Sequence, residues 1–112
     1  MKNNIIEINY NNFDQILKDN IVLVDFWAEW CHPCKLQHKV LDDLAFENQD
    51  VFKIATLNVD DNKVIASKLS VRNIPTLILY KNGVEVRRMI GLQSKEMIMN
   101  QINNSLTEKK IA

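Results

Sequence analysis

A nearly unbroken apolar run, Ile21 to Trp27, comes shortly before the chain's two cysteines, Cys31 and Cys34. Consecutive apolar residues are typical of a central strand that is covered on both faces of a sheet. From Cys34 to Asn48, the apolar residues instead recur at helical spacing. The sequence therefore predicts a buried strand that leads into a helix, with both cysteines at the junction.

The two cysteines are separated by His32 and Pro33, so they are able to close a small disulfide ring and to open it again. Pro33 stiffens this ring. At the start of a helix, free backbone N–H groups and the helix dipole stabilise a thiolate on the first cysteine, Cys31. This arrangement is typical of a dithiol that exchanges electrons with other disulfides. A pair of inert thiols is the alternative.

The rest of the chain alternates short strands and helices. Asn82-Gly83 is typical of a two-residue hairpin turn. Asp60 or Asp61 is expected to cap a short third helix, and Ser94 is expected to cap the last one. The order βαβαβαββα predicts an α/β domain with a mixed sheet. Strands are expected at Ile5–Tyr10, Ile21–Trp27, Phe52–Val59, Thr76–Tyr80 and Val84–Ile90.

Length and charge narrow the classes of function. With 112 residues, the chain is expected to form one domain over residues 1–112. Lys and Arg number 14, as do Asp and Glu, so the net charge is zero and no nucleic-acid surface is expected. No apolar run is long enough to cross a membrane, and no apolar signal segment follows Met1, so a cytoplasmic location is expected. In that compartment, close cysteines are more often catalytic or metal-binding than structural.

Four stretches of the chain resemble the thioredoxin family in order and spacing. They are Val24 to Lys35, which contains both cysteines, Leu57 to Asp60, Ile74 to Thr76, and Lys81 to Gly83 with Gly91 beyond it. The resemblance covers nearly the whole chain and implies the thioredoxin fold, a five-stranded mixed β-sheet flanked by four α-helices. It also implies a protein-disulfide reductase with no bound cofactor, recharged from NADPH through a thioredoxin reductase.

The resemblance gives roles to three side chains near the junction. Cys31 would attack the substrate, and Cys34 would resolve the mixed disulfide by attacking Cys31. Asp25, which interrupts the apolar strand, would take and return the proton of Cys34. Burying a carboxylate is costly, so desolvation is expected to raise the pKa of Asp25. The alternative is a strand-end carboxylate that is bonded to backbone amides.

Four further residues would form a substrate-binding surface around Cys31. Trp30, Ile74 and Gly91 offer apolar contact to unrelated extended peptides. The family resemblance implies a cis peptide bond before Pro75, which would offer the backbone of Ile74 to a substrate segment, as in strand addition. The expected partners are a thioredoxin reductase and disulfide-containing proteins, and the chain is expected to be a monomer.

His32 stands where glycine is usual in the family. As an imidazolium beside Cys31, it would stabilise the thiolate and make the protein more oxidising. Alternatively, its ring points into water and has little effect. The chain also departs from the family at Lys39, Thr56 and Asn73, where proline, lysine and glycine are common.

His38 lies four residues after Cys34, on the same helix face. The two histidines and two cysteines could in principle be the four ligands of a zinc ion. Structural zinc sites usually draw ligand pairs from two separate segments, and no second pair is present, so no metal site is expected. His38 is therefore expected to be a surface residue.

Two other functions stay open at the level of sequence. A disulfide oxidase or isomerase is favoured by His32 and disfavoured by the lack of a signal segment. A binding subunit would use the same fold regardless of its redox state, and would keep its partner function after loss of both cysteines.

Overall fold

The apolar run forms β2 (Ile21–Trp27), the middle strand of a five-stranded sheet. The computed structural model describes residues 4–107, and the strand order across its sheet is β1-β3-β2-β4-β5. β2 pairs in parallel with β3 and antiparallel with β4, and residues 21–26 are all buried. The prediction of a central strand covered on both faces is confirmed.

The element order βαβαβαββα is confirmed, with five strands and four helices over residues 4–107. The other strands are β1 (Ile5–Glu7), β3 (Lys53–Asn58), β4 (Thr76–Lys81) and β5 (Val84–Ile90). The helices are α1 (Phe13–Leu17), α2 (His32–Glu47), α3 (Lys63–Lys68) and α4 (Lys95–Thr107).

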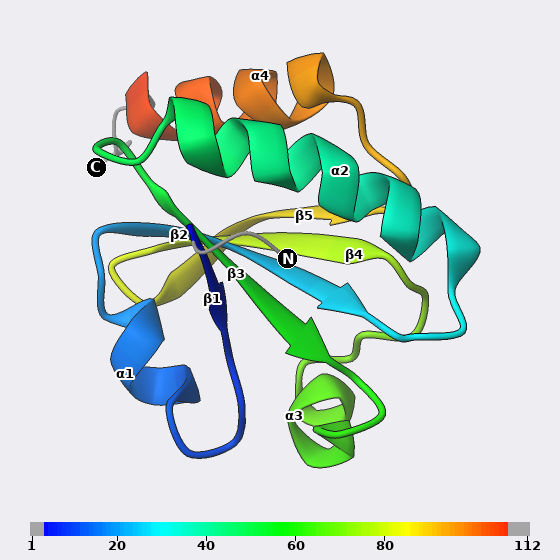
Figure 1. The fold of residues 1–112 in the computed structure, drawn as a ribbon. Coiled ribbons are helices and arrows are strands. Elements are labelled where there is room, and N and C mark those ends of the chain that lie inside the picture. Colours follow the sequence, from blue (N-terminus) through cyan, green and yellow to red (C-terminus); the bar gives the residue numbers. More distant parts are fainter. Residues whose placement is uncertain (1–3, 108–112) are drawn as a thin grey trace.

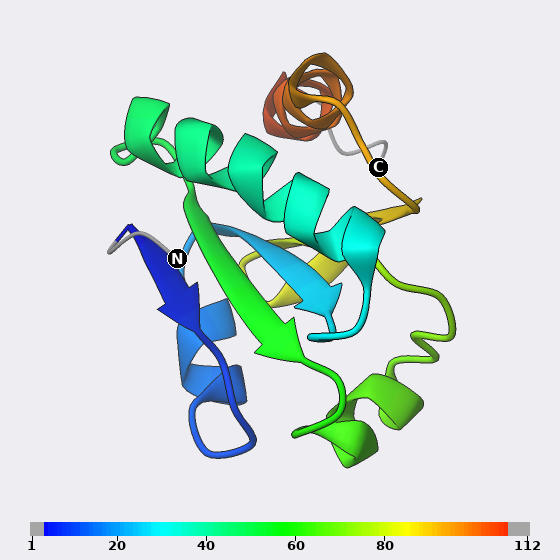
Figure 2. The ribbon, with the colours of Figure 1, turned by 45° about the vertical axis from the view of Figure 1, so that its right-hand side comes forward.

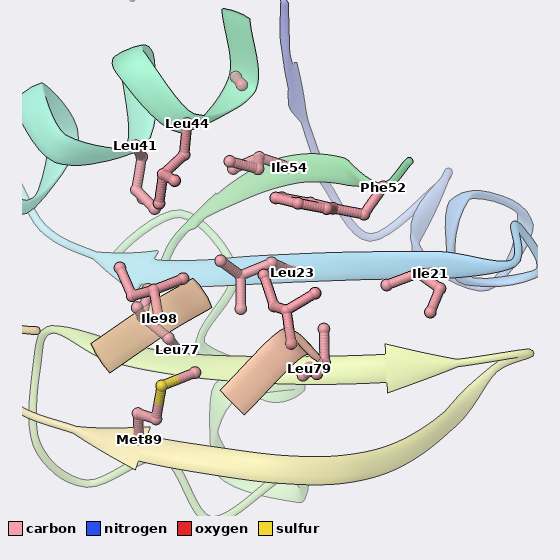
Figure 3. Close-up of a cluster of buried hydrophobic side chains, with 12 residues drawn as sticks. Ile21, Leu23, Leu41, Leu44, Phe52, Ile54, Leu77, Leu79, Met89 and Ile98 are labelled. Carbon is pink, nitrogen blue, oxygen red and sulfur yellow. The ribbon is translucent and has the colours of Figure 1, made fainter. Parts of the chain in front are cut away.

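The sheet lies between two layers of helices, with α2 and α4 on one face and α1 and α3 on the other (Figures 1 and 2). Because successive strand residues point to opposite faces, Leu23 packs in the cluster under α2 and Val24 in the cluster on the other side. In Figure 3, Leu41 and Leu44 of α2 point toward the sheet residues Leu23 and Ile54. This alternation decides which side chains of β2 meet α2.

Several strands begin or end at other residues than the sequence pattern indicated. β1 ends at Glu7, not Tyr10, because the side chain of Asn9 accepts the backbone N–H of Asn11 at 2.8 Å and closes a turn. β3 is one residue shorter at each end, and β4 extends to Lys81. These differences leave the topology unchanged.

The hairpin turn and the last cap are confirmed, whereas the cap of α3 is not. Asn82 and Gly83 have φ values of +53° and +83°, as a two-residue hairpin turn requires. Ser94 Oγ accepts the N–H of Met97 at 3.1 Å. Neither Asp60 nor Asp61 caps α3, because Asn58 Oδ1 accepts the N–H of Asp60 at 2.9 Å in a turn before the helix. The residue in the cap position is Asn62.

Candidate active site

The register of the sheet brings the candidate residues together at one end of its strands. Phe26 near the end of β2 pairs with Thr76 at the start of β4, and Thr76 pairs with Ile90 at the end of β5. The residues just outside these pairs, Pro75 and Gly91, therefore meet, and the Gly91 N–H donates to the Pro75 carbonyl at 2.8 Å. At this same end of the sheet, the chain leaves β2 and continues into α2 (Figure 1).

Both cysteines lie at the first turn of α2. Cys31 is the N-cap residue, and its Sγ accepts the backbone N–H of Cys34 at 3.2 Å. Pro33 lies in the first turn, where a missing N–H costs nothing. The two cysteines form a disulfide with Cα atoms 5.3 Å apart. Cys31 is 4% exposed and Cys34 is fully buried, so the sulfur nearer to solvent is that of Cys31.

The disulfide packs into a small apolar cluster. Cys31, Cys34 and Ala28 form its buried part, and Ile74 and Trp27 are among the half-buried residues packed against them. The peptide bond between Ile74 and Pro75 is cis, as the family resemblance implies. Ile74 itself lies in the cluster that holds the disulfide.

Trp30 is 71% exposed, yet its ring is held in place. Its Nε1–H donates to Asp60 Oδ2 at 2.9 Å. The contact follows from register, because Trp27 pairs with Asn58 and places the segment after β3 beside the segment after β2. Asp60 is therefore a positioning residue that the sequence pattern had assigned to a helix cap. The signal that could have found it was its place in the Leu57 to Asp60 stretch.

Asp25 is fully buried on the face of β2 that α2 covers, two residues after Leu23. Its neighbours across the sheet are Thr56 on β3 and Leu77 on β4. Within residues 4–107, neither carboxylate oxygen receives a well-aligned hydrogen bond. The alternative interpretation, a carboxylate bonded to backbone amides, is therefore wrong.

The side chain of His38 contacts Asp25, with Nε2 3.0 Å from Asp25 Oδ2. Burial raises the pKa of Asp25 above its ordinary value of 3.8, and the contact with His38 opposes part of that rise. The His38 ring also meets the Trp27 ring edge-on, with centroids 4.8 Å apart. The expectation of a surface histidine is wrong, because only 14% of the side chain is exposed.

Gln37 is a structural link that the sequence analysis missed. Its side chain is fully buried, donates to the Gln93 carbonyl at 3.0 Å and accepts the Gln93 N–H at 2.7 Å. These two bonds tie α2 to the segment just after Gly91 and so fix one wall of the site. A glutamine in an amphipathic helix gives no local signal that it is buried.

His32 and Lys39 lie exposed on α2. Among residues 4–107, no three side chains of His, Cys, Asp or Glu are grouped as a metal would require. Over the same residues, no helix has both the length and the apolar character needed to span a bilayer.

A disulfide at the N-terminus of a helix, packed against Ile74 where the strands of a mixed sheet end, defines a thiol–disulfide oxidoreductase. The family model "Thioredoxin" matches residues 4–104. The chain belongs to the thioredoxin family, as its motifs predicted, and functions as a protein-disulfide reductase. Thioredoxins carry a redox-active disulfide without a prosthetic group.

The relatives match almost end to end. A thioredoxin of Rickettsia typhi is 41% identical over 107 residues, which are 95% of this chain and 100% of that protein. A thioredoxin of Chlamydia pneumoniae is 46% identical over 96 residues, 86% of this chain and 93% of that one. The structure of a mutant thioredoxin from Halobacterium salinarum NRC-1 superposes with a TM-score of 0.81 at 33% identity, covering 96% of this chain and 94% of that chain. The predicted fold is confirmed.

Proposed function

We propose that Cys31 is the nucleophile and Cys34 the resolving thiol of this reductase. The Cys31 thiolate attacks a substrate disulfide, forms a mixed disulfide and releases one substrate thiolate. The Cys34 thiolate then attacks the Cys31 sulfur, which closes the Cys31–Cys34 bond and releases the second substrate thiolate. Two electrons pass from the dithiol to the substrate. The observation that carries this order is the position of Cys31 Sγ at the helix cap, where it accepts the Cys34 N–H.

In this proposal, Asp25 removes the proton of Cys34 before the second attack. A carboxyl whose pKa burial has raised is a better proton acceptor near neutral pH than an ordinary one. Asp25 lies under α2, and its partner His38 is one helical turn beyond Cys34. We expect this placement to bring the thiol and the carboxylate close together on the buried side of the helix.

The substrate would bind along the edge formed by Trp30, Ile74, Pro75 and Gly91. The Ile74 backbone would pair with an extended substrate segment, as in strand addition. The exposed indole of Trp30, held by Asp60, adds an apolar contact with little sequence preference. Such a surface suits many unrelated disulfide-containing proteins.

We further propose that a thioredoxin reductase recharges the disulfide with electrons from NADPH. The chain would act as a monomer in the cytoplasm. The near end-to-end match to thioredoxins supports this assignment.

Cys34→Ser is expected to accumulate covalent complexes with substrate proteins, because Cys31 still attacks but nothing resolves the mixed disulfide. Cys31→Ser is expected to trap none. The measurement is non-reducing electrophoresis after incubation with a disulfide-containing protein, with dithiothreitol added to a duplicate sample to release the complexes. Equal trapping by the two variants would reverse or remove the assigned roles.

His32 favours a second candidate, a disulfide oxidase or isomerase, because it stands at the first residue of α2 beside Cys31. A cation there stabilises the thiolate and therefore the reduced state. We expect His32→Gly to lower the reduction potential by on the order of 10 mV or more, measured against glutathione. An unchanged potential would leave His32 without influence and would disfavour the oxidase.

A further inference from the structure

The Asp25 carboxyl has no direct route to water. It is fully buried between Thr56 and Leu77, so a proton that it accepts reaches water only through a neighbouring side chain. Its nearest basic group is the His38 imidazole, whose Nε2 is 3.0 Å away and itself shielded from solvent. The side chain of His38 as a whole reaches solvent, because 14% of it is exposed. The side chain of His38 therefore spans the distance between the buried carboxyl and water.

The other groups packed around Asp25 are unable to do this. Thr56 on β3 and Leu77 on β4 do not titrate in the relevant range, and Cys34 on α2 is the proton donor itself. Along α2, Lys35 and Asp42 are at helical spacing from His38, but within residues 4–107 neither forms an ion pair with it. His38 is thus the titratable contact of Asp25 in the part of the chain that the structure describes.

The orientation of the ring is fixed from its other side. Trp27 meets the His38 ring edge-on at an interplanar angle of 75°. Because Trp27 follows Asp25 by two residues, both side chains lie on the α2 face of β2 and hold the ring between them. An imidazole held in this way presents Nε2 to the carboxylate, and its second nitrogen, Nδ1, is left for exchange with water.

We propose that His38 is a positioning residue that acts through Asp25, relaying the proton of Cys34 from the buried carboxyl to solvent. The inference rests on the proposed role of Asp25. Cys34–SH gives its proton to the Asp25 carboxylate, and the resulting thiolate attacks Cys31. Neutral His38 then takes the proton from Asp25 at Nε2, restores the carboxylate and becomes imidazolium. The imidazolium loses a proton from Nδ1 to water, which leaves Nε2 protonated. When the disulfide is reduced again, the steps run in reverse: Nδ1 takes a proton from water, Nε2 gives its proton to Asp25, and Asp25 protonates Cys34. Charge, protons and the ring tautomer are then restored over the cycle.

The test separates the two attacks in time. Reduced protein is mixed with excess of a chromogenic aromatic disulfide, and release of the coloured thiolate is followed by stopped flow. The first release is the attack of Cys31 and depends on reagent concentration. The second is the attack of Cys34, does not depend on reagent concentration, and is recorded as a function of pH. The proteins compared are the wild type, His38→Gln, His38→Ala and the control Lys39→Gln, which changes an exposed neighbour on α2.

We expect the first release to be unchanged in all four proteins. The second release is expected to slow by roughly tenfold at neutral pH in both His38 variants, less than the ~10²-fold attributed to a primary general base, because Asp25 remains. Its pH midpoint is expected to move upward, since the contact with His38 that lowers the pKa of Asp25 is gone. Lys39→Gln should follow the wild type. Circular dichroism and melting temperature verify that each variant is folded.

The outcomes separate this relay from the proposed function. If the second release and its midpoint match the wild type in both His38 variants, the relay is wrong although the reductase assignment stands. If only His38→Gln matches, the ring serves as a hydrogen-bond donor and not as a relay, which also overturns the inference. Loss of the first release in the wild type would instead contradict the proposed function.

Discussion

Asp25→Asn is expected to stabilise the disulfide form of the protein at neutral pH, even though it removes a residue of the proposed mechanism. The carboxyl is fully buried, and the nearby His38 offsets only part of the penalty for its charge. Asparagine has nearly the same shape and no charge to desolvate. The expected gain in the free energy of unfolding is about 1 kcal/mol or more, because burial raises the pKa of Asp25 and a tenfold change in proton affinity corresponds to about 1.4 kcal/mol.

The gain should depend on pH in a definite direction. Burial raises the pKa of Asp25 in the folded state above its ordinary value of 3.8. In the pH window between 3.8 and this raised pKa, the folded state holds a proton that the unfolded state has released. The stability of the wild type therefore falls as pH rises through the window. The advantage of the variant should vanish at low pH, where the carboxyl is protonated in both states.

Urea denaturation of the disulfide forms from about pH 3 to about pH 8 measures this advantage. Asp43→Asn is the matched control, because it removes an exposed carboxylate from α2 and is expected to change stability by less than about 0.5 kcal/mol. An advantage of Asp25→Asn that is equal at both ends of the pH range would show that the buried charge is not its cause.

The central strand and the topology were predictable because they rest on apolar patterning. β2 is apolar on both faces, and its burial follows directly from that run. The ends of the elements were less predictable, since Asn9 and Asn58 accept backbone N–H groups and close turns that compete with the strand and the helix. Such local bonds are decided by a few degrees of backbone rotation rather than by pattern.

The chemistry of the site was predictable where the backbone fixes it. A strand followed directly by a helix predicted that Cys31 and Cys34 lie at the start of the helix, and both lie there. The surroundings of Asp25 were not predictable, because His38 borders the apolar stripe of α2. Whether a side chain at such a border meets water or the sheet depends on how the helix is rotated, and the packing of Leu41 and Leu44 sets that rotation. The same reason hid Gln37.

Phe26 follows Asp25 directly in β2, and Phe26→Ala is expected to lower the stability of the protein strongly, whereas Asp25→Asn is expected to raise it. Phe26 is fully buried, and it points away from Asp25 into the cluster on the α1 and α3 side of the sheet. Removing its ring leaves a cavity and should lower the free energy of unfolding by about 3–5 kcal/mol, a large share of the ~5–15 kcal/mol typical of a domain. The melting temperature should fall by on the order of 15 °C.

This loss should be the same at low and neutral pH. The one titratable side chain among the described residues of this cluster is Tyr80, and burial raises its pKa to about 12, so it stays uncharged over that range. Phe46→Ala is the control, since Phe46 is 67% exposed on α2 and its loss should change stability by no more than about 0.5 kcal/mol. Thermal unfolding of both variants measures the difference. If the two substitutions lower the free energy of unfolding equally, Phe26 does not fill the core. The alternation of β2 side chains between the two faces of the sheet, which places Asp25 beneath α2, would then also be wrong.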